Sequence, residues 1–233
     1  MTIAENVEAV RSSIADAALR AGRSVGEIRL MAVTKYVPID RIALAADAGI
    51  TLIGENRAQE FTEKLTFYKQ RNLEAHFIGQ LQTNKVKYIC GSADMIQSVD
   101  RPALLEAVAR RAAARGVVQP ILFEVNIGNE PQKGGFDPND LDAYVEAAQG
   151  LAGVRLCGLM CVPPAGTPEE ARPYFRRMRA LFERLRLSVP TADTLSMGMS
   201  RDYPIAIEEG STLVRVGTAI FGARTIQGGT VNG

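Results

Sequence analysis

The sequence lacks most of the residues that metal sites and hydrolytic triads require. Its 233 residues include no tryptophan, one histidine and three cysteines. A Ser-His-Asp triad would have to use His76, and a histidine-rich metal site is excluded. Cys90, Cys157 and Cys161 lack the paired spacing of a zinc site, so we expect no metal. Their odd number favours buried thiols in a reducing cytoplasm over a disulfide framework.

Net charge and long apolar runs are also scarce. The 27 lysines and arginines nearly balance the 26 acidic residues, which leaves a net charge of +1. This balance gives no reason to expect a nucleic-acid or membrane partner. No apolar run is long enough for a membrane helix, and residues 1–10 lack the basic start and apolar block of a signal peptide. We therefore expect a cytoplasmic chain.

The sequence does contain a regular alternation of short apolar runs and longer amphipathic stretches. A capped helical pattern covers residues 2–21. Eight candidate strands follow, at residues 28–34, 51–53, 75–78, 94–97, 120–126, 154–160, 194–197 and 212–216. Helical patterns between or after them cover residues 39–48, 56–71, 84–90, 101–115, 138–149, 168–187 and 202–209.

Strict alternation of strands and helices predicts parallel strands with right-handed crossovers. Eight such units predict an α/β fold, a single (β/α)₈ TIM barrel over residues 1–224 with an extra N-terminal helix. An open doubly wound sheet fits less well, because no G-x-G-x-x-G follows the first strand. The glycine-rich residues 225–233 are expected to form a flexible C-terminal tail.

Lysine is rare, and one lysine occupies a strand end. The chain has six lysines against 21 arginines. Four of them, Lys64, Lys69, Lys85 and Lys87, fall in helical patterns and are expected to be solvated. Lys35 ends the first apolar run instead, where barrels place their functional residues. Partial desolvation there would free its amine as a nucleophile toward carbonyls. Alternatively, the side chain simply reaches water.

Two glycine-containing turns follow the seventh and eighth strands, where barrels often bind phosphate. Ser200, Gly217 and Thr218 suit that role, although two ordinary turns would look similar. Arg215 lies in the last strand and either faces inward toward a ring nitrogen or an anion, or faces outward toward a helix carboxylate. A lysine nucleophile, a phosphate pocket and an arginine together fit pyridoxal 5′-phosphate (PLP) as the cofactor.

Eight sequence blocks then point to a known family. They are AVTK (32–35), IGENRAQEF (53–61), HFIGQLQTNK (76–85), SVDR (98–101), VNIGNEPQKGGF (125–136), GLMCVPP (158–164), LSMGMSRD (195–202) and VRVGTAIFGAR (214–224). With these blocks the chain resembles the PLP homeostasis proteins of the YggS/PROSC type, which are similar to the N-terminal barrel domain of alanine racemase. The blocks span nearly the whole chain in order.

The resemblance implies a role for each candidate site residue. Lys35 forms the Schiff base with PLP, and Arg215 lies by the pyridine nitrogen and keeps it unprotonated. The phosphate is held by Ser200, Gly217 and Thr218. Asn56 and Asn126 line the cofactor, and Met197 or Met160 packs beneath the ring. His76 is expected to be packed rather than catalytic.

One position departs from the family pattern. Many members carry a second lysine two residues beyond the Schiff-base lysine, but Val37 occupies that position here. A cofactor relay through that second lysine is therefore absent. Lys133, in a loop near the barrel rim, could take part in cofactor transfer instead, or it could be a solvated loop lysine.

The expected function is binding and delivery of PLP. The resemblance also brings a contrast. Racemases with this barrel domain use a second base, a tyrosine from the partner subunit's C-terminal β-domain. This chain ends shortly after the eighth predicted strand, so we expect no such domain, and a monomer. It would keep free PLP low and supply PLP-dependent apo-enzymes transiently. The alternatives are a PLP-dependent amino-acid racemase and a phosphate-binding barrel enzyme without a covalent cofactor.

Overall fold

The computed structural model describes residues 1–223, which form a closed barrel of eight parallel strands in sequence order. The strands are β1 (Arg29–Val33), β2 (Leu52–Glu55), β3 (Glu74–Phe77), β4 (Met95–Val99), β5 (Gln119–Glu124), β6 (Val154–Met160), β7 (Thr194–Met199) and β8 (Leu213–Val216). Pairing of β1 with β8 closes the sheet. The TIM barrel prediction is confirmed, whereas the predicted tail at residues 225–233 lies outside the described residues.

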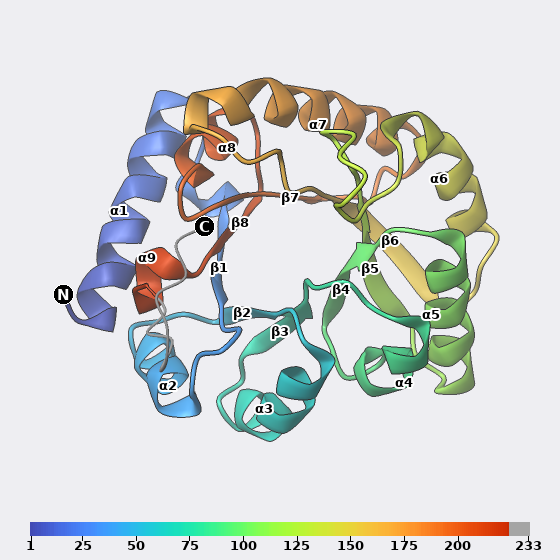
Figure 1. Cartoon of the computed structure of the whole chain (residues 1–233), viewed down its shortest axis with the longest axis horizontal. Coiled ribbons are helices and arrows are strands. Elements are labelled where there is room, and N and C mark those ends of the chain that lie inside the picture. The colour runs from blue at the N-terminus through green and yellow to red at the C-terminus, as the bar shows by residue number, and fades with distance from the viewer. Residues whose placement is uncertain (224–233) are drawn as a thin grey trace.

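Helices surround the strands as an outer ring (Figure 1). They are α1 (Ile3–Arg20), α2 (Ile39–Asp47), α3 (Ala58–Gln70), α4 (Val86–Ile89), α5 (Pro102–Ala114), α6 (Leu141–Gln149), α7 (Pro168–Ser188), α8 (Tyr203–Glu208) and α9 (Thr218–Phe221). Three short 3₁₀ turns cover Val25–Glu27, Thr83–Lys85 and Pro138–Asp140. No helix of the described chain is both long and apolar enough to span a membrane.

Three predicted strands end two residues too early, and one helix was missed. Strand β4 continues through Ser98 to Val99, past its predicted end at residue 97. Strands β2 and β7 extend two residues beyond their predicted ends, because Gly54–Glu55 and Gly198–Met199 break the apolar run without breaking the ladder. The short helix α9 follows β8 directly. Its four residues are too few to show a helical period in the sequence.

The extra N-terminal helix α1 covers one side of the barrel next to α8 and α9 (Figure 1). A capping box begins it, since Thr2 Oγ1 accepts from the Glu5 amide and Glu5 accepts from the Thr2 amide. Its apolar face is buried through Val7, Val10, Ile14, Ala17 and Ala18. The side-chain amide of Asn6 donates to the carbonyl of Ile220 in α9 at 2.8 Å, which connects the helix to the end of the barrel.

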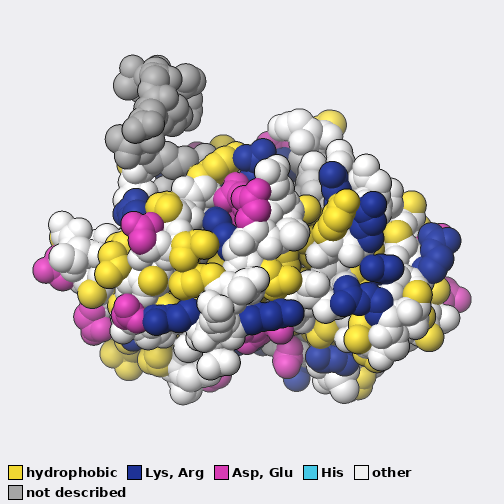
Figure 2. All heavy atoms as spheres, turned by 90° about the horizontal axis from the view of Figure 1, so that it is seen from below, with side chains coloured by type: hydrophobic (Ala, Val, Ile, Leu, Met, Phe, Trp, Pro, Cys, Tyr) yellow, Lys and Arg dark blue, Asp and Glu magenta, His cyan; other side chains and the backbone are white. Residues whose placement is uncertain are grey.

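The barrel has an apolar outer core and a partly polar interior. The large core cluster lies between the strands and the helix ring, whereas the interior holds small apolar clusters around Met31 and Met160. Inside the barrel Gly54 leaves room for Met31, because a Cβ there would lie 2.5 Å from the methionine sulfur. The exterior on the α2–α4 side mixes basic, acidic and apolar side chains (Figure 2).

Candidate functional site

A cavity opens at the C-terminal ends of β1, β6, β7 and β8, where a barrel is expected to carry its function. It has a volume of about 400 Å³, within the range of small-molecule sites. Five of the eight predicted site residues line it: Lys35, Ser200, Arg215, Gly217 and Thr218. The structure thus brings together residues that lie far apart in the sequence.

Lys35 is carried by a tight turn directly after β1. The Val37 amide donates to the Thr34 carbonyl at 3.0 Å, and Tyr36 adopts a left-handed conformation with φ of 60°. The Tyr36 amide also donates to the carboxylate of Glu60 in α3 at 2.8 Å. These contacts fix the backbone on both sides of Lys35, whose side chain is half-buried at the cavity.

A buried polar cluster supports this turn from behind, and it corrects one prediction. Lys64 was expected to be solvated, but it is only 7% exposed. Its Nζ donates to the Glu55 carboxylate at 2.7 Å and to the Thr34 carbonyl at 2.9 Å. Thr34 Oγ1 and Tyr68 Oη donate to the same Glu55 oxygen at 2.7 and 2.9 Å. The charge of Lys64 is buried because these partners replace its hydration.

The two loops after β7 and β8 contact each other through Ser200. Its Oγ accepts from the backbone amides of Gly217 at 3.1 Å and Ala219 at 3.4 Å. Asp202 holds the first loop in place by accepting from the Met199 amide at 2.6 Å. The result is a compact corner of hydroxyl and amide groups at the cavity, which is the chemistry that binds phosphate oxygens.

Arg215 faces the barrel interior, which decides between the two orientations left open by the sequence. It is 4% exposed and still lines the cavity. Its Nη1 donates to Ser196 Oγ at 2.6 Å and its Nη2 donates to the Cys161 carbonyl at 2.7 Å. Among residues 1–223 no carboxylate forms an ion pair with it. Burial lowers the pKa of this guanidinium, and its charge is available to an electron-rich ligand atom.

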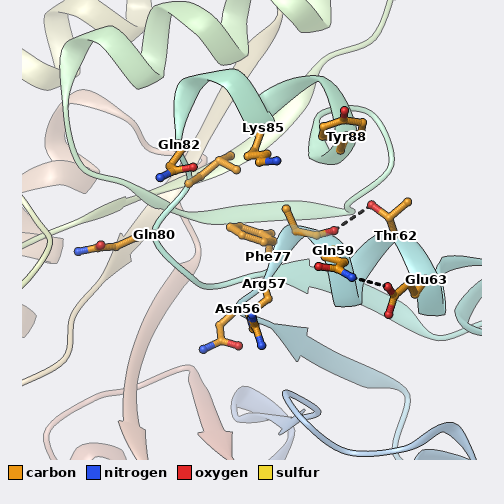
Figure 3. Close-up of a pocket in the computed structure, with 12 residues that line it drawn as sticks. Asn56, Arg57, Gln59, Thr62, Glu63, Phe77, Gln80, Gln82, Lys85 and Tyr88 are labelled. Carbon is orange, nitrogen blue, oxygen red and sulfur yellow. Dashed lines mark hydrogen bonds between the residues drawn. The ribbon is translucent and has the colours of Figure 1, made fainter.

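The other three predicted residues are not among those that line this cavity. Asn56 lines a second, larger cavity of about 840 Å³ beside α3 and α4 (Figure 3). The Asn126 side chain closes its own loop through two hydrogen bonds with the backbone of Glu130. Met197 packs in the outer core, while Met160 belongs to an apolar cluster inside the barrel. His76 is fully buried, as expected.

Lys133 is not a solvated loop lysine. Its Nζ donates to the Pro163 carbonyl at 2.8 Å and pairs with the Glu130 carboxylate at 2.5 Å. The loop that carries it folds back onto β5, since the Asn126 amide donates to the Phe136 carbonyl at 2.9 Å. Lys133 thereby becomes a second lysine on the wall of the cavity that contains Lys35.

Glu124 is a buried carboxyl at the end of β5, and no pattern in the sequence points to it. Burial raises its pKa from 4.5 to about 7, and nearby Asp100 acts in the same direction while Arg215 opposes it. The folded chain therefore holds a proton that the unfolded chain releases at lower pH. Between these two values the folded state binds more protons, so the contribution of Glu124 to stability falls as the pH rises.

Replacing Glu124 with glutamine tests this assignment. The variant Glu124→Gln has no carboxyl to ionise, so its unfolding free energy should rise relative to wild type by about 2.5 kcal/mol between about pH 5 and about pH 8. Urea unfolding of both proteins at the two pH values measures the change. A difference between the proteins that does not vary with pH would show that Glu124 is not held protonated.

Comparison with known proteins decides the family. The family model of the alanine racemase N-terminal domain matches residues 3–225. The pyridoxal phosphate homeostasis protein of Aquifex aeolicus is 43% identical over 226 residues, which cover 96% of this chain and 99% of that protein. The chain belongs to the pyridoxal phosphate homeostasis protein family.

Solved structures show how the family relates to the racemases. PipY of Synechococcus elongatus with PLP bound has a TM-score of 0.82 at 34% identity, and the match covers 95% of this chain and 100% of that chain. An alanine racemase from Streptomyces coelicolor has a TM-score of 0.67 at 22% identity, covering 93% of this chain and 58% of that chain. The racemase thus shares the barrel fold with this homeostasis-family chain.

Proposed function

We propose that this chain binds PLP in the cavity that contains Lys35, holds it as a Schiff base, and delivers it to PLP-dependent apo-enzymes. The observation that carries the proposal is the convergence of Lys35, the Ser200 and Gly217 corner and Arg215 on one cavity. In this proposal the carrier is a cytoplasmic monomer that keeps free PLP low. The free thiols of Cys90, Cys157 and Cys161 fit a reducing compartment.

The residues present fit the chemical groups of PLP. Lys35 would hold the aldehyde of PLP through its amine, as a Schiff base. The Ser200 and Thr218 hydroxyls offer hydrogen bonds to the phosphate, and the Gly217 amide orients Ser200 by donating to its Oγ. The Arg215 guanidinium can only donate hydrogen bonds. The ring nitrogen of PLP would therefore accept with its lone pair and stay unprotonated. Bound PLP supplies an electrophilic ring system. With Arg215 beside an unprotonated ring nitrogen, that ring withdraws electrons only weakly.

The lining of the cavity favours a carrier over a racemase. Racemisation needs a second acid or base on the face opposite the Schiff-base lysine. Among the described residues that line the cavity there is no tyrosine and no histidine. Lys133 is the other amine, and its hydrogen bond and ion pair hold it at Pro163 and Glu130. This arrangement favours storage of the cofactor over turnover.

Transfer to an apo-enzyme tests the function itself. PLP-loaded protein is mixed with an apo-enzyme while a phosphatase destroys any free PLP. We expect the enzyme activity to recover more than it does from the same amount of free PLP under the same conditions. Equal recovery from both sources would contradict delivery. Chiral analysis of L-alanine incubated with the loaded protein tests the racemase alternative, which rapid appearance of D-alanine would support.

Ser200→Ala removes the hydroxyl at the proposed phosphate corner. A hydrogen bond to a charged group contributes about 1.5–3 kcal/mol, so the dissociation constant for PLP should rise at least about tenfold. Absorption titration of the apo-protein measures this constant. Ser12→Ala changes an exposed serine on α1 and serves as the control. Equal affinity for both variants would place the phosphate elsewhere.

Lys133→Ala tests the role of the second lysine in release. In the relay that this variant tests, Lys133 leaves Glu130 and Pro163 and accepts the aldehyde from Lys35. Without it we expect transfer to an apo-enzyme to slow by about tenfold or more, with little change in the amount of PLP bound. The phosphatase-coupled transfer assay gives the rate. Lys87→Ala removes an exposed lysine on α4 and is the control. An unchanged transfer rate in Lys133→Ala would exclude the relay.

A further inference from the structure

A chain of hydrogen bonds crosses the barrel interior from β8 to β3. Arg215 Nη1 lies 2.6 Å from Ser196 Oγ, and Ser196 Oγ lies 2.7 Å from Gln97 Oε1. Gln97 Nε2 lies 2.8 Å from His76 Nδ1, and His76 Nε2 lies 2.7 Å from the Glu74 carboxylate. Ser196, Gln97 and His76 are fully buried. These hydrogen bonds link the Lys35 cavity to the opposite end of the barrel.

The hydrogen bonds between the two ends have a consistent direction in the structure. Arginine can only donate, so Ser196 Oγ accepts from Arg215, and the Ser196 hydroxyl donates to Gln97 Oε1. The Gln97 amide must then turn its nitrogen toward His76 Nδ1, which accepts. The single ring proton of His76 therefore lies on Nε2. It is donated to Glu74, whose pKa the hydrogen bond from His76 lowers to about 2.

We propose that Gln97 and His76 are positioning residues that hold the Arg215 guanidinium in its orientation toward the cofactor cavity. The ring of His76 fixes the Gln97 amide, because a flipped amide would place its oxygen against the unprotonated Nδ1. Fixed in this way, Gln97 accepts the hydrogen bond from the Ser196 hydroxyl, which leaves the Ser196 lone pairs for Arg215. This role rests on the proposed function, because it concerns the arginine that meets the PLP ring.

The use of neutral partners is central to this role. A carboxylate next to Arg215 would orient it as well, but it would also neutralise the charge that faces the cavity. A serine hydroxyl supported by an amide and a neutral imidazole orients the guanidinium and leaves its charge unpaired. Glu74 is the one carboxylate in this series of hydrogen bonds. It lies at the far end, separated from Arg215 by the side chains of Ser196, Gln97 and His76.

The protonation state can be measured without any cofactor. His76 is the only histidine of the chain, so ¹⁵N-histidine labelling gives one pair of ring resonances. In the apo-protein at neutral pH we expect a bonded proton on Nε2 and none on Nδ1. In Gln97→Glu the new carboxylate can only accept, so we expect Nδ1 to gain a proton and the ring to become cationic. A proton on Nδ1 in the wild type, or an unchanged ring in Gln97→Glu, would overturn the proposal.

The effect on Arg215 is tested with PLP. Gln97→Leu removes the acceptor of the Ser196 proton, and Ser196→Ala removes the acceptor of Arg215. Both variants should bind PLP about tenfold more weakly and shift the absorption maximum of the bound cofactor. Ser196→Thr keeps the hydroxyl and should rescue both the affinity and the spectrum. Thermal unfolding confirms that each variant is folded.

Failure of the proposed function and failure of the positioning role give different results. If wild-type protein binds no PLP, the proposed function fails, while the ring resonances of His76 still report the direction of the chain. If wild-type protein binds PLP and Gln97→Leu binds it with the same affinity and spectrum, the positioning role is refuted and the proposed function stands.

Discussion

Lys35→Ala is expected to abolish the covalent PLP complex. The variant keeps the phosphate corner and Arg215, so residual binding is non-covalent, and we expect the dissociation constant to rise about 100-fold, equivalent to about 2.7 kcal/mol. The absorption band of the Schiff base should be missing at every PLP concentration. Absorption titration of the apo-protein gives both the spectrum and the constant.

Lys133→Ala provides the matched control for this prediction, because Lys133 is the other lysine in the same cavity. It should keep the wild-type spectrum. A Schiff-base band that persists in Lys35→Ala and disappears in Lys133→Ala would reverse the assignment. A band that persists in both variants would place the cofactor outside this cavity.

Lys64→Met is expected to have the largest effect on stability. The substitution leaves the Glu55 carboxylate fully buried without its cation, and breaking a buried ion pair costs about 3–5 kcal/mol. Burial and the nearby Glu55 raise the pKa of Tyr68, so its hydroxyl remains a donor but cannot supply the missing charge. Urea unfolding measures the loss, and Lys69→Met, at an exposed position of α3, is the control.

The same substitution should also affect cofactor binding. Lys64 Nζ donates to the carbonyl of Thr34, the residue before Lys35. Loss of this bond loosens the turn, so folded Lys64→Met protein should bind PLP more weakly than wild type. Adding Glu55→Gln removes the stranded charge and should recover part of the lost stability. Equal unfolding free energies for Lys64→Met and Lys69→Met would contradict the structural account of the buried cluster.

The sequence predicts the barrel, and the strand ends at which a site is expected, because both follow from local patterns. Buried parallel strands are short apolar runs, and all eight were located. The C-terminal ends of barrel strands meet at one face. Strand positions alone therefore predict that Lys35, Ser200 and Thr218 lie close to one another. The boundary errors at β2 and β7 arose where glycine interrupts the apolar run.

Contacts between distant residues were not predictable in the same way. Helical periodicity placed Lys64 on α3, but its burial depends on Glu55 and Thr34, which only the closed barrel brings to it. Gln97 and Ser196 carry no sequence signal, since an interior polar residue is recognisable only by its partners. The hydrogen bonds between the Asn126 side chain and the Glu130 backbone likewise exist only in the folded loop. These features depend on tertiary packing.

Borohydride reduction of the wild-type protein loaded with PLP tests the central claim most directly. Reduction converts a Schiff base into a stable secondary amine, so the pyridoxyl group remains on its lysine through proteolysis. Mass spectrometry of the peptides should place one such group on Lys35 and none on the other five lysines. Absence of any pyridoxyl group, or a group located only on another lysine, would contradict the account.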